Sequence, residues 1–493
     1  KISDIVFKNK VVILFVLLGV GANVAYKQPL TFVIPELFTR IARNSFIVLS
    51  LIIPVIAGMG LNFGIVIGAM AAQVAIFLTT YWGFTGIGGF LATVALATPF
   101  SVFFGFLVGK LFNHMKGNEM IGGLVLGYFA EGIYQLVFLF IFGGAIKLDH
   151  PTLMIPTGIG VKNTIDLKDT VKYALDTVPM LTIVEIGFYV VRLWLAGSAI
   201  FQLVKKQPVN WKSTGIKAGV AAVVYGLTFI GPVERFLAAD RLLLLSCVEL
   251  ACLVTVLWQG FRFVRWKMKG SPKSAEGEPG GFIPQKAIAY VLLAAVVYGL
   301  TYVPAIYKVL IAVRLPVMTY VCIGALCGFN NILMRTRLGQ NMRTVGQSRT
   351  VANAAGINVD KTRVIAMIFS TVLASWGQLI FLQNVGTLTT YGAHTQVGQF
   401  AIAALLVGGA SVQKATNRQA LLGVVLFHTL FIVSPLAGKE LFGDPVIGEY
   451  FRVFVSYGVI AMALAMHAWK KVASPKVGNA GTAGAVASAG KAG

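Results

Sequence analysis

The sequence predicts an all-α, polytopic transmembrane bundle of about 12–14 helices. Hydrophobic residues make up 57% of the 493 residues, charged residues make up 12%, and the mean hydropathy is +0.80. A soluble protein carries about 25% charged residues, so this composition excludes a soluble chain around one core. The apolar residues also gather in runs of roughly 17–25, the length that a helix needs to cross a bilayer.

These apolar runs define the predicted spans in chain order. The run at 11–26 lacks a convincing cleavage pattern, so we interpret it as the first span and not as a secretory signal. Whether 398–412 is a re-entrant helix or a short span stays open, because periodicity does not separate the two. The predicted spans cover residues 11–26, 45–60, 62–82, 88–112, 119–144, 183–204, 215–231, 241–264, 287–305, 316–336, 363–382, 398–412, 416–434 and 450–469.

Basic residues stand at the ends of these runs, and this placement accounts for the net charge of +23. It argues against nucleic acid as a partner, because the charge is not gathered on one face. The positive-inside rule then puts both termini and the loop 335–364 in the cytoplasm. Arg40 and Arg43 are the exception, and we expect them in an outside loop that forms an amphipathic interfacial helix.

The loop from Arg335 to Val364 is the longest polar run between two predicted spans. Alanine favours a helix and glycine suits the left-handed residue after a helix end, so residues 350–359 predict a short helix stopped by Gly356. Small side chains on such a helix let another surface come close, which favours a docking role. An ordinary cytoplasmic loop fits the spacing equally well.

Residues 346–359, GQSRTVANAAGINV, resemble the cytoplasmic coupling loop of bacterial ABC importer permeases of the ribose, branched-chain amino acid and nucleoside (basic membrane protein-associated) group. The resemblance continues at 401–411, AIAALLVGGAS, and more weakly at 60–68, GLNFGIVIG. Residues 116–121, KGNEMI, are similar to the Asn-Glu-x-Ile motif of the nucleoside branch. The resemblance covers 335–412 and, less specifically, 46–144, whereas 183–305 match no part of it.

The resemblance implies a permease subunit that moves a small polar solute across the bacterial inner membrane by alternating access. The solute would be a nucleoside, a related heterocycle such as riboflavin, or a simple sugar. The implied partners are cytoplasmic ABC ATPases that bind ATP-Mg, a second permease chain (identical or related), and a substrate-binding lipoprotein or periplasmic protein. The residues that the resemblance assigns to ATPase coupling are Arg343, Gly346, Arg349, Asn353, Ala354, Ala355 and Gly356.

The domain organisation follows from the spans and the loops between them. The tail is rich in Ala, Gly and Ser, and we expect it to be disordered. The expected units are an N-terminal transmembrane half at 1–144, an external loop at 145–182, additional helices at 183–305 with a cytoplasmic linker at 266–286, a C-terminal half at 306–472 and a tail at 473–493.

An internal repeat lies within the additional helices. Residues 221–228, AAVVYGLT, are identical to residues 294–301 at an offset of 73. At the same offset Arg241-Leu242 matches Arg314-Leu315. We interpret the repeat as a duplicated helix hairpin with parallel orientation, extra to the usual family core.

Two other features predict surfaces. Four lysines and four aspartates, Asp176 among them, give the external loop a mixed-sign surface that suits docking to a polar protein, although a solvated loop fits as well. Gly60, Gly64 and Gly68 are spaced four apart, which predicts a glycine stripe on one helix face. We favour close helix packing for this stripe, and a backbone lining for a solute path is the alternative.

No pattern for catalysis is present in the sequence. There is no phosphate-binding loop with the required spacing, no His/Asp/Ser arrangement, and no cysteine or histidine pair with metal-ligand spacing. We therefore expect no catalytic residue, no metal and no cofactor in this chain, and an ATPase on another chain.

Polar residues inside predicted spans are costly, so each is a functional candidate. Glu131 and Gln135 are four apart and share a helix face, where Tyr134 would add a stacking ring for a solute. A hydrogen bond between helices explains the same residues. The candidates for the substrate path are Asn62, Gln73, Asn118, Glu119, Glu131, Tyr134 and Gln135.

An ion-coupled secondary transporter is the alternative function. It needs no ATPase, and a carboxylate such as Glu131 would bind a proton or sodium ion near the membrane midplane. The resemblance of the 346–359 loop argues against this alternative.

Overall fold

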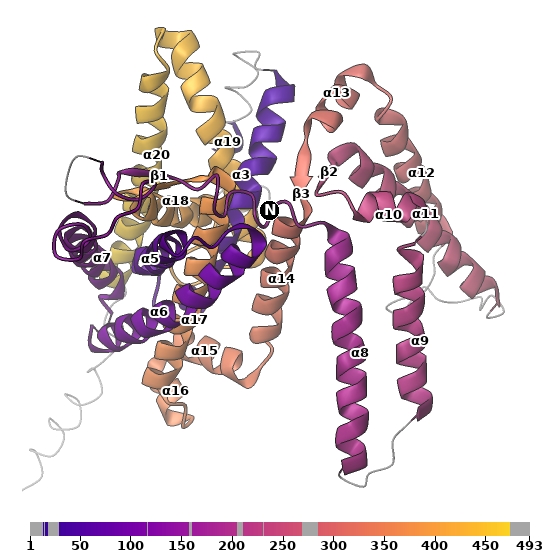
Figure 1. The fold of residues 1–493 in the computed structure, drawn as a ribbon, viewed down its shortest axis with the longest axis horizontal. Helices are drawn as coiled ribbons and strands as arrows, with labels where there is room; N and C mark the ends of the chain where they lie inside the picture. Colours follow the sequence, from indigo (N-terminus) through magenta and orange to yellow (C-terminus); the bar gives the residue numbers. More distant parts are fainter. Residues whose placement is uncertain are drawn as a thin grey trace, which may run out of the picture.

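The computed structural model describes residues 13, 15–17, 29–115, 117–156, 160–204, 211–229, 231–268 and 284–473. These residues form helices joined by turns and short strands (Figure 1). The predicted span at 11–26, the linker at 266–286 and the tail at 473–493 lie mostly outside them. The elements are α3 Leu30–Ser50, α4 Ile52–Ile56, α5 Ile65–Tyr81, α6 Gly86–His114, α7 Glu119–Leu136, the π-helix η1 Val137–Ile141, β1 Thr164–Asp166, α8 Met180–Val204, α9 Trp211–Leu227, α10 Gly231–Leu237, β2 Arg241–Leu243, α11 Leu244–Met268, α12 Pro284–Leu300, α13 Pro304–Ala312, β3 Arg314–Pro316, α14 Val317–Leu333, α15 Arg337–Gln347, α16 Arg349–Ala354, α17 Val359–Val385, β4 Thr387–Thr389, α18 Ala393–Val407, α19 Asn417–Phe442 and α20 Pro445–Ala473.

Helix α17 is the centre of the bundle, and α3, α5 and α6 pack around it (Figure 1). Glycines permit this packing. A Cβ atom at Gly105 of α6 would lie 2.8 Å from the Cα atom of Ile368, and one at Gly377 of α17 would lie 2.9 Å from the Cα atom of Ile47. Close backbone contact between small residues is the usual basis of helix association in membranes.

The chain between α4 and α5 crosses the bundle interior without helical structure. Gly58 and Gly60 have φ angles of 73° and 72°, in the left-handed region that favours glycine. The predicted glycine stripe is therefore wrong: Gly60 lies in this break, Gly64 precedes the first turn of α5, and only Gly68 is helical. Irregular backbone at membrane depth occurs where protein surrounds it or where it lines a path.

The polar segment between α7 and α8 folds onto one end of the bundle. Its strand β1 pairs antiparallel with β4, with Ile165 opposite Leu388. Asp176 is 1% exposed and accepts hydrogen bonds from Thr319, Gln383 and Asn384 at 2.6–2.8 Å. Asp176 is thus wrongly assigned to a docking surface by the sequence, because three donors compensate for the burial of its carboxylate.

The repeat is visible as two copies of one helix–helix–strand–helix unit. The first copy is α9, α10, β2 and α11, and the second is α12, α13, β3 and α14. Strands β2 and β3 pair antiparallel with Leu242 opposite Leu315, its counterpart at the offset of 73. Pairing of equivalent residues relates the two strands by a local two-fold axis. A short helix and a strand replace the simple turn expected within each copy, and Pro304 starts the second short helix.

The apolar helices agree with a multi-pass membrane protein. Seven described helices are long and apolar enough to cross a membrane, or up to nine if each bent pair counts as one span. One of them runs from Leu30 to Ile56, so the predicted outside loop with Arg40 and Arg43 is wrong. Both arginines lie in α3, where their guanidinium nitrogens contact the Glu36 carboxylate at 2.8 and 3.3 Å and their charge is partly neutralised.

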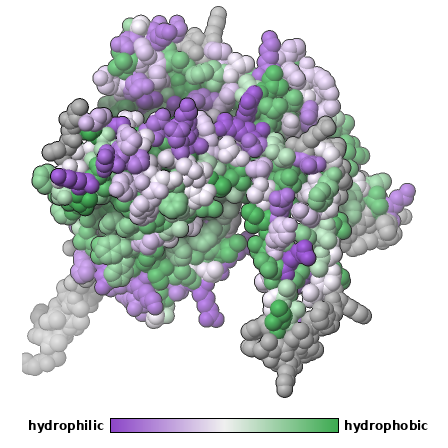
Figure 2. All heavy atoms as spheres, viewed as in Figure 1, coloured by the Kyte–Doolittle hydropathy of each residue, from purple (hydrophilic) through white to green (hydrophobic). Residues whose placement is uncertain are grey.

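The surface of the bundle is banded. Figure 2 shows a hydrophobic zone between a hydrophilic band over the segment around β1 and a hydrophilic patch at the end that carries α15 and α16. This banding indicates the two polar boundaries of a membrane-spanning body.

Candidate solute path and coupling site

Glu131 on α7 is the centre of a polar cluster inside the bundle, with 18% of its side chain exposed. Its Oε1 atom accepts a hydrogen bond from Gln135 Nε2 at 2.8 Å, as their four-residue spacing predicts. Its Oε2 atom accepts one from Thr395 Oγ1 at 3.1 Å and is also hydrogen-bonded to His394 Nε2 on α18. The cluster therefore joins α7 to the short helix α18.

Tyr134 is packed within this cluster. Its ring stacks on Phe138 with centroids 4.4 Å apart, and the His394 ring lies 4.8 Å away. The Tyr134 hydroxyl and His394 Nδ1 are buried and have no hydrogen-bond partner among the described residues. The ring that we expected to stack on a solute thus contacts Phe138 and His394 in this structure.

A small cavity adjoins the cluster. Its volume of about 20 Å³ suits one water molecule and not a sugar or a nucleoside. A solute would need α7 and α18 to separate. The lining residues are Phe63, Val66, Leu124, Gly127, Tyr128, Glu131, Thr395, Gly398, Gln399 and Ile402.

A second polar site follows the contact between α5 and α17. Asn62 Nδ2 donates to Ser370 Oγ at 3.2 Å, and Gly68 lies against the backbone of Thr371. Gln73 lies on α5 and Gln378 lies on α17. Both glutamine side chains are fully buried, and neither amide has a partner among the described residues. Unpaired buried amides need an explanation, and a hydrated solute path supplies one.

A third cluster lies at the end of the bundle near α15 and α16. Glu119, the first residue of α7, binds both Arg349 of α16 and Arg363 of α17 through one carboxylate oxygen. The side chains of Glu119 and Arg363 are 6% and 2% exposed, whereas that of Arg349 is 35% exposed. Glu119 thus lies at the end of the bundle that carries α15 and α16, apart from Glu131, with which the sequence analysis groups it.

The short helix α16 is presented outward, as residues 350–359 predict. Ser348 Oγ accepts from the backbone N–H of Val351 at 3.3 Å, and Gly356 after the helix end has a φ angle of 74°. Val351 is 59% exposed, and the rest of the outer surface is small or charged. Of the residues that the resemblance assigns to ATPase coupling, Arg343, Asn353, Ala354, Ala355 and Gly356 are exposed.

The packing beneath α16 leaves no room for larger side chains. A Cβ atom at Gly346 of α15 would lie 2.0 Å from the carbonyl oxygen of Ile56 and 3.0 Å from the backbone nitrogen of Gly58. Helix α15 therefore rests directly on the break between α4 and α5. A displacement of α15 and α16 would therefore change the backbone packing at the break between α4 and α5.

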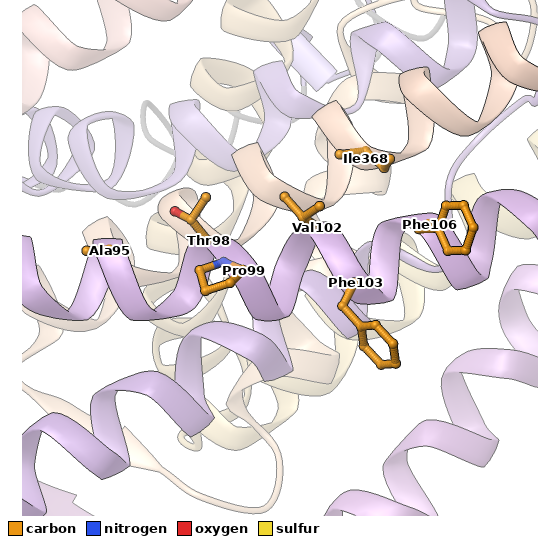
Figure 3. A pocket seen from close by; sticks show the side chains of 7 residues that line it. All are labelled: Ala95, Thr98, Pro99, Val102, Phe103, Phe106 and Ile368. Atoms are coloured by element: carbon orange, nitrogen blue, oxygen red, sulfur yellow. The ribbon is translucent and has the colours of Figure 1, made fainter.

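Two hollows of the described structure are apolar. Figure 3 shows one of about 720 Å³ along α6, where Thr98 supplies the only side-chain hydroxyl of the lining. That hydroxyl accepts from Trp376 Nε1 at 3.0 Å. Another hollow, of about 340 Å³, lies between α5, α6 and α7 and is lined almost wholly by apolar side chains. Such surfaces suit lipid or another apolar helix and not a polar solute.

The structure shows one selected residue that joins neither cluster, and three residues that the sequence analysis missed. Asn118 precedes α7, is exposed, and makes no side-chain cap hydrogen bond. His394, Thr395 and Arg363 complete the clusters but were not selected. Their signal in the sequence is a polar group at the edge of an apolar run, and their partners lie 244–264 residues away in the chain.

Comparison with known proteins adds a family. The model of the family described as branched-chain amino acid transport system, permease component, matches residues 194–464. This match includes most of the region 183–305 that the sequence resemblance left unassigned. The xylose transport system permease protein XylH of Haemophilus influenzae is 27% identical over 176 residues, which are 36% of this chain and 44% of that protein. The matched part of the chain thus spans less than half of that relative. No solved structure matches.

Proposed function

We propose that this chain, which belongs to the permease component family of branched-chain amino acid transport systems, is the membrane-spanning subunit of an ATP-driven importer of a small polar solute. One observation carries the proposal. Helix α7 begins at Glu119, bound to α16, and carries Glu131, bound to α18, twelve residues later. At 1.5 Å per residue these contacts are about 18 Å apart along one helix.

The match to the permease component family supports the proposed partners. Cytoplasmic ATPases bind the exposed surface of α15 and α16 and hold ATP-Mg themselves. A second permease chain completes the path, and a lipoprotein or periplasmic receptor delivers the solute. ATP stabilises one arrangement of the ATPases, α16 moves with them, and Glu119 transmits that movement to α7 and α17. The path then opens to the other side by a shift between two populated states.

A sugar is the favoured solute class, with a nucleoside or a related heterocycle such as riboflavin as the next candidate. XylH is named for xylose transport, which supports a sugar. The polar groups near the path also fit hydroxyl-rich solutes, because amides donate and accept hydrogen bonds and a carboxylate accepts them. Gln73, Gln378 and Glu131 are the residues that we assign to solute contact.

The first experiment measures the ATPase activity of the reconstituted complex with each candidate solute and receptor. It compares Gly356→Glu with Gly443→Glu. Both glycines have φ angles near 75° and open space around them, but Gly443 follows α19 at a site remote from α16. The pair therefore matches backbone strain and added charge while differing in position.

The expected result is that one solute stimulates the ATPase, that Gly356→Glu loses this stimulation while the chain still inserts, and that Gly443→Glu keeps it. Equal stimulation in all three proteins contradicts the assignment of 343–359 as the coupling loop. Stimulation by a nucleoside and not by a pentose overturns the preference for a sugar.

An ion-coupled transporter is the second candidate function, and the pair of Glu131 and His394 inside the bundle favours it. In that case Glu131→Gln abolishes proton-driven uptake. Under the importer proposal Glu131→Gln leaves transport ATP-dependent and weakens the apparent solute affinity by roughly tenfold, the value of one hydrogen bond to a charged group.

A further inference from the structure

We infer that a cavity between the bundle and the repeat strands binds a phosphate group. This cavity has a volume of about 350 Å³ and collects residues from α3, the segment before α8, β2, β3 and the end of α17. Three arginines and one aspartate line it. The lining residues are Thr39, Arg43, Tyr173, Asp176, Arg241, Arg314, Pro316, Asn384 and Val385.

The positive charges of the lining outnumber its negative charges. Asp176 is the one carboxylate beside three arginines, and Glu36 already contacts Arg40 as well as Arg43. Arg241 and Arg314 form no ion pair with any residue that the structure describes. The buried Nε atom of Arg43 likewise finds no hydrogen-bond partner in the described part of the chain. Arg43, Arg241 and Arg314 all line this cavity, and guanidinium groups match phosphate oxygens in a bidentate way.

The repeat builds this site. Arg241 and Arg314 are equivalent residues at the offset of 73, and they start strands whose pairing places Leu242 opposite Leu315. The local two-fold axis thus brings two copies of one arginine to the same cavity. A single copy of the repeat would supply only one of them.

Tyr173 forms the wall opposite the strands in a strained conformation. Its φ angle is 56°, and it is the single non-glycine residue with a positive φ in the described ranges. Its ring lies 4.6 Å from the guanidinium carbon of Arg241, and its backbone N–H donates to the Gln383 carbonyl at 2.9 Å. Such strain persists where the surroundings fix it, which is typical of binding sites.

The cavity lies at one polar boundary of the bundle. Helix α14 begins directly after β3 and contains 17 residues before the turn that leads to α15. Its length of about 26 Å approaches the ~30 Å of a hydrocarbon core. Arg314 therefore lies about one membrane thickness from the coupling end, at the depth of lipid headgroups. The phosphate group belongs either to a phospholipid headgroup or to a free phosphate ester, and the chemistry of the cavity is the same for both.

The test uses the purified full chain and two kinds of probe, soluble phosphates and a phospholipid. Thermal unfolding is followed against sodium phosphate and glycerol 3-phosphate at constant ionic strength, with glycerol as the neutral control. Native mass spectrometry counts retained phosphatidylglycerol after delipidation and titration. The variants are Arg241→Gln, Arg314→Gln and the double variant. The matched control is Lys168→Gln, because Lys168 is an exposed cation in the segment between α7 and α8 that also carries Tyr173.

We expect saturable binding to the wild type, a loss of roughly tenfold in affinity for each single variant, and a larger loss for the double variant. The two single losses should be similar, because the residues are repeat equivalents. Binding of the lipid alone identifies a headgroup site, and binding of the soluble anions alone identifies a free phosphate ester. If the wild type binds neither probe, or if the arginine variants bind as Lys168→Gln does, the inference is overturned.

Discussion

The helices of the central bundle and the additional helices α8, α9, α11 and α12 are similarly apolar, but they differ in how much of their surface other helices cover. In α17, 61% of the most apolar window is buried, against 6% in α8 and 11% in α11. The bundle also buries polar residues in paired clusters, whereas α8, α9, α11 and α12 present large apolar side chains outward. Apolar composition alone thus does not separate a helix that forms the transport body from one that lipid covers. What separates them is backbone proximity through glycine and the polar contacts between helices.

The buried ion pairs provide the largest expected contrast between the two regions. Glu119→Gln leaves Arg363 buried without a charged partner, which should destabilise the fold by about 3–5 kcal/mol. Glu249→Gln is the matched control, because Glu249 is exposed on α11 of the duplicated region. Unfolding midpoints in lipid check both variants. If the midpoint for Glu119→Gln is as high as that of the control, the cluster of Glu119, Arg349 and Arg363 does not stabilise the bundle.

Glycine substitutions test the difference in packing between the two regions, and we expect effects on stability of intermediate size. Gly346→Ala places a Cβ atom 2.0 Å from the Ile56 carbonyl oxygen, so α15 must shift, at a cost of about 1–3 kcal/mol. Gly299→Ala on α12 meets no atom within 4 Å, and alanine favours a helix, so its midpoint should stay equal or rise. The same unfolding assay compares the two. Equal destabilisation by both substitutions would show that close packing is not special to the bundle.

Removal of one repeat should have the smallest effect. Deletion of residues 211–283 removes one full offset of 73 and joins α8 to α12, the counterpart of α9. The contacts of α17 with α3, α5 and α6 are untouched, so solute-stimulated ATPase activity should persist. The assay is the ATPase measurement on the reconstituted complex. Loss of stimulation with normal membrane insertion would assign the duplicated helices to the transport cycle itself.

Much of this architecture follows from local sequence. The apolar runs predict most helices to within a few residues, alanines and Gly356 predict α16, and the repeat predicts the equivalence of Arg241 and Arg314. The start of α3 at Leu30 was missed because two arginines suggested a loop, although Glu36 lies on the same helix and partly neutralises them. A charge pair one turn apart is compatible with an apolar helix.

The features that sequence reasoning could not predict depend on distant partners. In the break between α4 and α5, Gly58 packs against Gly346 of α15. These two residues lie far apart in the chain. Asp176 looks like a surface charge until its three donors are known. Glu131 was selected from its position in a span, but its contact with His394 joins residues 263 positions apart. Local periodicity carries no information on such pairs.

The most direct test of the central claim is solute uptake into proteoliposomes that contain the complex, with ionophores collapsing all ion gradients. ATP is supplied on the side of α15 and α16, and wild type is compared with Gly356→Glu and Gly443→Glu. The account predicts uptake that requires ATP, persists without any gradient, and is lost only in Gly356→Glu. Uptake that stops when the ionophores are added and does not depend on ATP would contradict the account. That result would favour an ion-coupled transporter that uses the Glu131–His394 pair.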